Sequence, residues 1–369
     1  MLNEEYLRPT VLEVNTEYFK ENVKKIKEYL EGNKKLIPVI KADGYGTEIN
    51  TRLELIEDFD IVAVALTGEG IYLRELGFKN DILILNQPSI NDISDIIKHN
   101  LTVGVASIEF LRALNEQNEN NYLNVKVHIE VETGMNRTGF NINDLSEDIK
   151  FIKECENVVV EGVYSHLSSA DNDDEYTKKQ IKTFEKAKEI IDENINTVKY
   201  YHLEASTGIL NYNIDMTNAA RPGLILYGYN VIENQNDKID LKPIAKLKSK
   251  VTFIKKVFKG ERIGYAGSFV VNEDMIIATI PVGYADGIPR ALSNVGEIVI
   301  NNQKARVVGK ICMDSFMVDV TNIKDVHVGT DVYIWDNEII TLKEMADRID
   351  TVNYEILSRI SKRVRREFI

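Results

Sequence analysis

The sequence predicts an α/β protein in which an N-terminal barrel of eight parallel strands precedes a smaller, mostly β domain. Two observations indicate this fold class. Short apolar, β-branched runs recur at intervals of roughly 20 to 40 residues up to about residue 224, with helical patterns between several of them. Beyond Pro243, short strand-like runs follow one another at close spacing, which is typical of antiparallel sheets.

The eight apolar runs are the candidate barrel strands. They span residues 36–40, 61–65, 82–85, 102–105, 125–131, 158–164, 199–203 and about 216–220. Residues 90–98 and 176–193 place apolar side chains three and four positions apart under a charged face, as crossover helices do. Eight such units in about 200 residues predict a TIM (β/α)8 barrel. An open doubly wound sheet is the alternative, but no G-x-G-x-x-G follows the first run to favour a dinucleotide site.

The C-terminal domain should contain short strands and two closing helices. The candidate strands span residues 246–254, 275–280, 297–300, 305–308, 317–320 and 331–334. Helical patterns cover 342–349 and 354–364, and the second ends in basic residues that suit a helix C-terminus. Polar residues 234–237 indicate a linker, so the predicted domains are 1–240 and 241–369.

Composition narrows the class of protein. The 369 residues are 44% hydrophobic and 28% charged, which excludes a disordered or collagen-like chain. A net charge of -13 argues against nucleic acid and anionic membranes as partners. The two cysteines, Cys155 and Cys312, cannot build a disulfide framework, and their spacing suits no zinc site, so no metal is expected. The acidic N-terminus lacks a signal-peptide pattern and no run reaches about 18 apolar residues, so we expect a cytoplasmic protein.

Lys41 is the first candidate for chemistry. It follows the run 36–40 directly and precedes the glycine-rich Gly44-Tyr45-Gly46, which places its amine at the C-terminal mouth of the barrel. Active sites of such barrels lie on that face. A surface lysine is the alternative, but a lysine that ends a buried strand is suited to covalent chemistry with a carbonyl group.

Two later loops carry a second cluster. Ser206 follows the seventh run within Glu204-Ala205-Ser206-Thr207-Gly208, and Gly223 follows the eighth within Arg221-Pro222-Gly223-Leu224. Barrels commonly bind phosphate in these two loops through hydroxyl and backbone N–H groups. Alone, these residues would more often be capping and turn residues. Together with Lys41 they indicate pyridoxal 5'-phosphate.

Eight motifs, in order along the chain, resemble those of alanine racemases. They are VIKADGYG at 39–46, ETGMNRTG at 132–139, YSHL at 164–167, RPG at 221–223, IGY at 263–265, PVGYADG at 281–287, VGKICMD at 308–314 and NYE at 353–355. The resemblance implies a fold-type III pyridoxal-phosphate enzyme that interconverts L- and D-alanine and supplies D-alanine for peptidoglycan. It also implies a homodimer in which the C-terminal domain contributes to the partner chain's active site.

The resemblance assigns roles by position. Lys41 would hold the cofactor and act as one acid/base, and the partner's Tyr265 would act as the other. Two bases on opposite faces of the substrate Cα explain racemisation, because one removes the proton and the other returns one on the opposite side. The implied cofactor-binding residues are Lys41, Tyr45, His166, Ser206, Arg221, Gly223, Leu224 and Tyr354, and the implied substrate-binding residues are Arg137 and the partner's Met313.

One departure concerns Glu130. The family commonly has a lysine there, modified to a carbamate that fixes the arginine matching Arg137. We hypothesise that the Glu130 carboxylate pairs with Arg137 directly; a rewired pocket for another substrate is the alternative. Three other functions stay open: a serine or broad-specificity racemase, a non-catalytic pyridoxal-phosphate carrier, and an amino-acid decarboxylase of related fold.

Overall fold

The computed structural model describes residues 8–119, 124–229 and 238–369. They group into two compact units. The barrel unit comprises Lys20–Gly44 and Ile49–Lys242. The C-terminal unit comprises the described residues up to Phe19, the short segment Tyr45–Glu48, and Pro243–Ile369. The predicted linker 234–237 lies outside the described residues.

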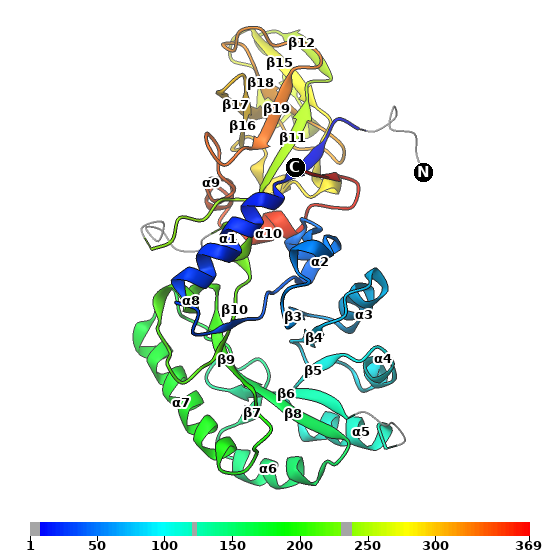
Figure 1. The fold of residues 1–369 in the computed structure, drawn as a ribbon. Coiled ribbons are helices and arrows are strands. Elements are labelled where there is room, and N and C mark those ends of the chain that lie inside the picture. Colours follow the sequence, from blue (N-terminus) through cyan, green and yellow to red (C-terminus); the bar gives the residue numbers. More distant parts are fainter. Residues whose placement is uncertain (1–7, 120–123, 230–237) are drawn as a thin grey trace. The chain divides into compact units, whose positions relative to one another are not determined.

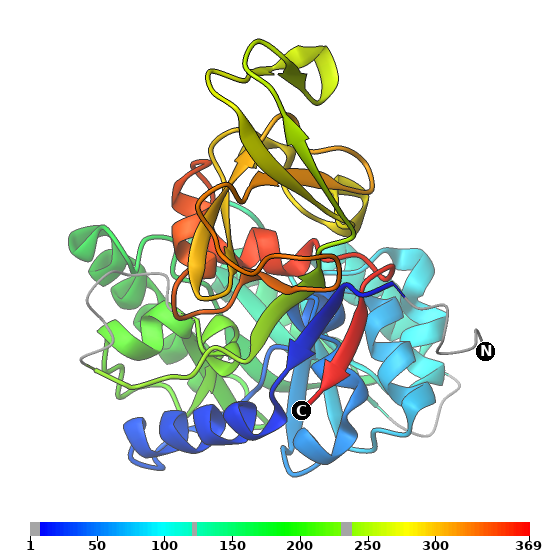
Figure 2. The ribbon, with the colours of Figure 1, turned by 90° about the horizontal axis from the view of Figure 1, so that it is seen from above.

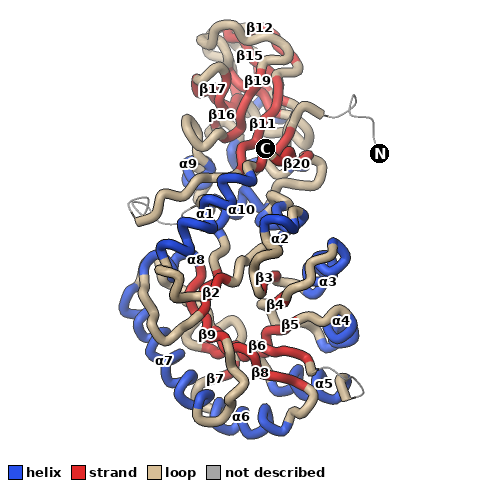
Figure 3. Tube along the Cα trace, in the orientation of Figure 1, coloured by secondary structure: helices blue, strands red, loops and turns tan. Residues whose placement is uncertain are grey.

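The barrel unit contains the predicted ring of eight parallel strands. Its sheet has the order β2-β10-β9-β8-β6-β5-β4-β3, and a bridge between Val39 and Ala63 joins its two ends. The strands are β2 (Lys35–Leu36), β3 (Ile61–Val64), β4 (Asp81–Ile84), β5 (Thr102–Val105), β6 (Val125–Glu132), β8 (Val158–Tyr164), β9 (Tyr200–Ala205) and β10 (Ala219–Arg221), with the short β7 (Phe140–Asn141) beside β6. Figure 3 shows these strands inside a ring of helices. The predicted barrel is confirmed.

Helices cover the outside of the sheet (Figure 1). They are α3 (Thr67–Leu76), α4 (Ile93–Lys98), α5 (Ile108–Gln117), α6 (Leu145–Glu154), α7 (Asp174–Asp192) and α8 (Ser206–Asn211), while α1 (Thr16–Tyr29) runs from one unit into the other. Helix α7 buries Thr177, Gln180, Phe184, Ala187 and Ile191, the three- and four-residue spacing of one helix face. Asp173 caps it by accepting the backbone N–H of Tyr176 at 2.9 Å. Strand β3 is buried throughout, which explains its unbroken apolar sequence.

A buried ion pair joins the start of β2 to β9 and yields a stability prediction. The Lys34 ammonium contacts the Glu204 carboxylate, and both side chains are nearly inaccessible. Lys34→Met should lower the free energy of unfolding by about 3 to 5 kcal/mol, because Glu204 would then be a buried charge without its cation. Urea denaturation measures this loss. The double variant Lys34→Met/Glu204→Leu should recover most of it, and equal stability of the two variants would contradict the assignment.

The C-terminal unit is built on a nine-stranded sheet of order β12-β15-β18-β17-β16-β19-β11-β1-β20. Its strands are β1 (Val11–Val14), β11 (Ala245–Lys250), β12 (Phe253–Val257), β15 (Met275–Ile280), β16 (Glu297–Ile300), β17 (Gln303–Val308), β18 (Phe316–Asp319), β19 (Asp331–Trp335) and β20 (Arg365–Phe368), and a separate pair joins β13 (Arg262–Ile263) to β14 (Phe269–Val270). Two short helices follow β19, α9 (Leu342–Asp347) and α10 (Asn353–Ser358). All pairings in this unit are antiparallel except that of β1 with β20.

Three sequence-based expectations for this unit were wrong in detail. The predicted helix 354–364 ends at Ser358; the basic residues at its predicted end, Lys362 and Arg363, lie in a turn, and β20 begins at Arg365. The predicted strand 246–254 is two strands, β11 and β12. The division at residue 240 assigned the N-terminal residues to the barrel, whereas β1 pairs with β11 and β20, so the described residues up to Phe19 belong to the C-terminal unit. Figure 2 shows β1, in blue, beside the red β20. These errors share a cause, because pairing with distant strands is not visible in a local pattern.

Within the described ranges, no helix has both the length and the apolar character needed to span a bilayer.

Candidate active site

Lys41 begins a strained turn, and residues 37–40, which include the bridge at Val39, separate it from the end of β2 at Leu36. It begins α2 (Lys41–Tyr45), immediately after Ile40, whose N–H donates to the Ala63 carbonyl at 2.9 Å. Ala42 and Asp43 adopt left-handed backbone angles, with φ of 53° and 51°. Such angles cost about 1 to 2 kcal/mol for each non-glycine residue. Backbone strain of this kind is found most often at functional sites, where contacts from surrounding residues maintain the strained conformation.

Glu69 supplies those contacts, and sequence analysis missed it. Its carboxylate accepts the backbone N–H of Ala42 at 2.6 Å, of Ala65 at 2.8 Å and of Leu66 at 3.1 Å. One side chain therefore joins the Lys41 turn to the loop after β3. Glu69 lies in the first turn of α3, where glutamate accepts backbone N–H groups, but the sequence analysis placed no helix there.

The surroundings of Lys41 lower the pKa of its amine. Burial lowers the pKa of Lys41, the nearby Arg137 and Arg221 cations lower it further, and Glu69 opposes them in part. Because a lowered pKa leaves more of the amine unprotonated at neutral pH, Lys41 is a better nucleophile and proton acceptor than a surface lysine.

Arg221 is a buried cation inside the barrel. It is the last residue of β10, one step earlier than the loop position expected from the sequence. Its NH1 group donates to Nδ1 and to the backbone carbonyl of His202, both at 2.6 Å, and its NH2 group donates to the Ser165 carbonyl at 2.7 Å. Burial lowers the pKa of Arg221 to about 10, so it stays charged at neutral pH. His202 was also missed, because it sits within an apolar run that a strand alone explains.

His166 lies close enough to Arg221, Arg137 and Lys41 for their charges to shift its pKa. Burial and the Arg221, Arg137 and Lys41 cations lower its pKa to about 3, so its imidazole is neutral. The expected cluster of Lys41, Arg137, His166 and Arg221 is therefore brought together in the barrel unit.

The two predicted phosphate loops meet. The segment 204–208 is not a loop, because strand β9 continues through Glu204 and Ala205 and helix α8 begins at Ser206. The buried Ser206 hydroxyl accepts the N–H of Gly223 at 3.0 Å and of Ile225 at 3.4 Å. Leu224 is buried at the start of a short 3-10 helix, Leu224–Tyr227. These contacts place a hydroxyl beside backbone groups of the last barrel loop.

Glu130 lies close to Arg137, as hypothesised. The Arg137 guanidinium is 3.8 Å from Oε1 of Glu130, and the Thr138 hydroxyl donates to Oε2 at 2.8 Å. Glu130 is 3% exposed, whereas the Arg137 side chain is about half exposed. Burial raises the pKa of Glu130, and Thr138 and Arg137 counteract part of that rise.

The remaining predicted site residues lie in the C-terminal unit. Burial and the neighbouring Tyr354 raise the pKa of Tyr45. A side chain at Gly46, which has a φ of 81°, would collide with the Leu357 carbonyl, so only glycine fits beside α10. Tyr265 and Met313 are 67% and 52% exposed, unusually high for large side chains.

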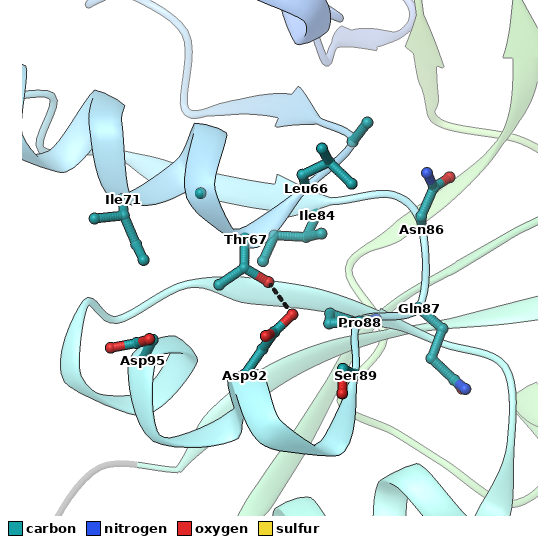
Figure 4. Close-up of a pocket in the computed structure, with 12 residues that line it drawn as sticks. Leu66, Thr67, Ile71, Ile84, Asn86, Gln87, Pro88, Ser89, Asp92 and Asp95 are labelled. Carbon is teal, nitrogen blue, oxygen red and sulfur yellow. Dashed lines mark hydrogen bonds between the residues drawn. The ribbon is translucent and has the colours of Figure 1, made fainter.

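A separate hollow lies at the ends of β3 and β4 (Figure 4). Its lining includes Leu66, Thr67, Gln87, Asp92 and Asp95, and Thr67 donates to Asp92 at 3.0 Å. No lysine or arginine is among the described residues that line it. Its carboxylates would repel a phosphate.

Comparisons with known proteins identify the family. A family model for the alanine racemase N-terminal domain matches residues 14–231, and one for the C-terminal domain matches 244–368. The chain is 38% identical to the alanine racemase of Clostridium novyi, over 99% of this chain and 96% of that protein. It is 34% identical to alanine racemase 1 of Caldanaerobacter subterraneus, over 98% and 95%.

Solved structures show the same likeness. An alanine racemase of Clostridium difficile 630 superposes with a TM-score of 0.92 at 34% identity, covering 98% of this chain and 96% of that one. An alanine racemase from Bacillus anthracis with bound L-Ala-P gives 0.90 at 30% identity, covering 99% and 96%. Since both family models match and relatives align over nearly their whole length, the chain belongs to the alanine racemase family.

Proposed function

We propose that this protein is a pyridoxal-phosphate-dependent racemase that interconverts L- and D-alanine in the cytoplasm and supplies D-alanine for peptidoglycan. The observation that carries the proposal is Lys41, an amine with a lowered pKa at the barrel mouth, grouped with Arg137, His166 and the buried Arg221. An exposed scaffold surface would not require such a group.

The residues present fit the cofactor. Lys41 offers an amine for covalent attachment, and Ser206 offers a hydroxyl for a phosphate beside the Gly223 N–H that it accepts in this structure. Leu224, Tyr45 and Tyr354 are proposed to complete the phosphate contacts. When bound, pyridoxal phosphate supplies an electron sink that makes the substrate α-proton acidic.

Two side chains of the protein are proposed to transfer the α-proton of the substrate. Lys41 takes or returns it on one face of Cα, and Tyr265 does so on the other. If pyridoxal phosphate were bound, Arg221 would donate toward the pyridine nitrogen. Because arginine has no acceptor atom, it would disfavour a proton on that nitrogen, and this would favour return of the proton over transamination or decarboxylation. His166 is neutral and proposed to lie in the same network.

Tyr265 and Met313 are proposed to serve the partner's site in a homodimer. Their high exposure in the single chain supports this, because a side chain that contacts another subunit need not be buried within its own chain.

Arg137 is proposed to bind the substrate carboxylate, with Glu130 holding it in place. Glu130→Gln should raise KM for alanine about fivefold with a smaller change in kcat, since a half-exposed ion pair contributes about 1 kcal/mol. In the unmodified protein KM should rise as pH falls, because protonated Glu130 no longer attracts Arg137. Burial raises the pKa of Glu130, so this rise begins at a higher pH than for an exposed glutamate.

Steady-state kinetics across pH tests this pairing. The Glu130→Gln variant should lack the acid-side rise in KM. Unchanged activity in Glu130→Ala, or an identical pH dependence of KM in Glu130→Gln, would contradict the pairing of Glu130 with Arg137.

The proposed function is tested by exchange of the Cα proton with solvent deuterium, followed by NMR on protein loaded with pyridoxal phosphate. Each enantiomer of alanine and serine is supplied separately. Exchange with inversion from both alanine enantiomers is expected, at a higher rate than for serine. A faster reaction with serine than with alanine would reassign the substrate. No exchange of the Cα proton in a folded protein that holds pyridoxal phosphate would favour the non-catalytic pyridoxal-phosphate carrier.

A further inference from the structure

Two buried histidines form a hydrogen-bonded series that begins at Arg221 inside the barrel. Neither has a role in the proposed mechanism. His128 on β6 and His202 on β9 are both 0% exposed. Nδ1 of His202 lies 2.6 Å from NH1 of Arg221, and Nε2 of His202 lies 2.7 Å from Nδ1 of His128. The three side chains form one continuous hydrogen-bonded row, from guanidinium to imidazole to imidazole.

Donor chemistry fixes the direction of this row. Arginine has only donor groups, so Nδ1 of His202 accepts and carries no proton. The proton of the neutral His202 ring is then on Nε2, which donates to Nδ1 of His128. Nδ1 of His128 therefore also lacks a proton, and that ring carries its proton on Nε2. Among the described residues Nε2 of His128 has no hydrogen-bond partner, so the row ends there.

The surroundings keep both rings neutral. Burial, Arg221 and Lys126 lower the pKa of His128 to about 3, and burial and Arg221 lower that of His202 well below its usual value. The rings packed against them are phenols. Tyr164 stacks on His202 at 5.1 Å between centroids, and Tyr200 stacks on His128 at 5.9 Å.

The neighbouring strand makes room for His128. Gly162 lies on β8, which pairs with both β6 and β9. A Cβ atom at Gly162 would lie 2.5 Å from Nδ1 of His128 and 2.6 Å from its Cε1. The pairing of β6 with β8 also shifts register between Val127 and His128. The barrel thus accommodates the ring at a position where any larger residue than glycine would displace it.

We propose that His128 is a positioning residue for Arg221: it holds His202 in the tautomer that accepts from the guanidinium, and so fixes the direction in which Arg221 points. The tautomers follow from the contacts alone, whereas the effect on catalysis rests on the proposed function. Loss of the His128 acceptor would leave the Nε2–H of His202 unpaired and allow its ring to turn or change tautomer. Arg221 would then lose its imidazole acceptor and be held only by backbone carbonyls, including those of His202 and Ser165, which would loosen its orientation.

The first test reads the tautomers directly. The protein, labelled with 15N-histidine, contains only five histidines, so each ring can be resolved in a long-range 1H–15N spectrum. His327→Gln, at an exposed position in the other unit, serves as the assignment control. His128 and His202 should both show a bare Nδ1 and a protonated Nε2, unchanged from about pH 6 to about pH 8. A protonated Nδ1 on either ring, or titration in that range, would overturn the proposal.

The second test separates positioning from packing. His128→Asn keeps an acceptor near the position of Nδ1, whereas His128→Leu removes it. His128→Leu should disturb the His202 signals and lower kcat for alanine about tenfold to a hundredfold, because a small misplacement near the reacting centre is costly. His128→Asn should retain the His202 tautomer and most of kcat, and Gly162→Ala should resemble His128→Leu.

The remaining outcomes are distinguishable. A His128→Leu variant with reduced thermal stability but an unchanged His202 spectrum and kcat would overturn the positioning role. The expected spectrum in a wild-type protein that racemises no amino acid would support the tautomers and overturn the proposed function instead.

Discussion

Lys41→Ala is expected to abolish racemisation, with activity lower by about 10^4-fold or more, because it removes both the attachment point of the cofactor and one of the two bases. Borohydride reduction of the loaded wild-type protein, followed by peptide mass analysis, should place the cofactor on Lys41. The variant should carry none there. This readout does not depend on catalytic activity.

Lys79→Ala is the matched control, since Lys79 is exposed in the same unit. It should leave activity and labelling of Lys41 unchanged. Because burial and two arginines lower the pKa of Lys41, its modification should reach a plateau at a lower pH than that of exposed lysines. Labelling elsewhere with full activity in Lys41→Ala would remove Lys41 from the mechanism.

Tyr265→Phe is expected to lower kcat by about 10^2 to 10^4-fold, the usual contribution of one general acid/base. The stereochemical result is more informative than the rate. With Lys41 still present, one enantiomer of alanine should continue to exchange its Cα proton with solvent but without inversion. Tyr72→Phe, at another exposed tyrosine, should behave as wild type.

Mixing two inactive variants tests which chain supplies Tyr265. A mixed dimer of Lys41→Ala and Tyr265→Phe chains has one site with both wild-type residues if Tyr265 serves the partner. Random reassembly should then restore about a quarter of wild-type activity, since half the dimers are mixed and half their sites intact. No recovery in a preparation shown to contain mixed dimers would contradict the shared site.

The barrel strands were predictable because their signals are local, and the candidate reactive residues were chosen from equally local motifs. A strand such as Ile61–Val64 is buried on both faces, and its unbroken apolar sequence indicates that burial. Lys41 beside Gly44 and Gly46 marks a strand end and a turn within a few residues. The pairing of Glu130 with Arg137 was also within reach, because the two residues lie on the end of one strand and the loop that follows it.

The residues that support the site were not predictable in this way. Glu69 reaches Ala42 across two loops, and His202 reaches His128 across two neighbouring strand pairings. Each looked like an ordinary helix or strand residue in its own segment. Strands β1 and β20 escaped notice for the same reason, since each is defined by its neighbours in the sheet.

The sequence by itself determined the barrel and the C-terminal β character, because periodicity acts over a few positions. It also supplied the candidate reactive groups on which the proposed function rests. Only the tertiary structure decided that the first strand belongs with the last, that Glu69 holds the lysine turn, and that two neutral histidines stand behind Arg221. Those features depend on long-range pairing and burial, which bring together groups whose local sequences carry no sign of one another.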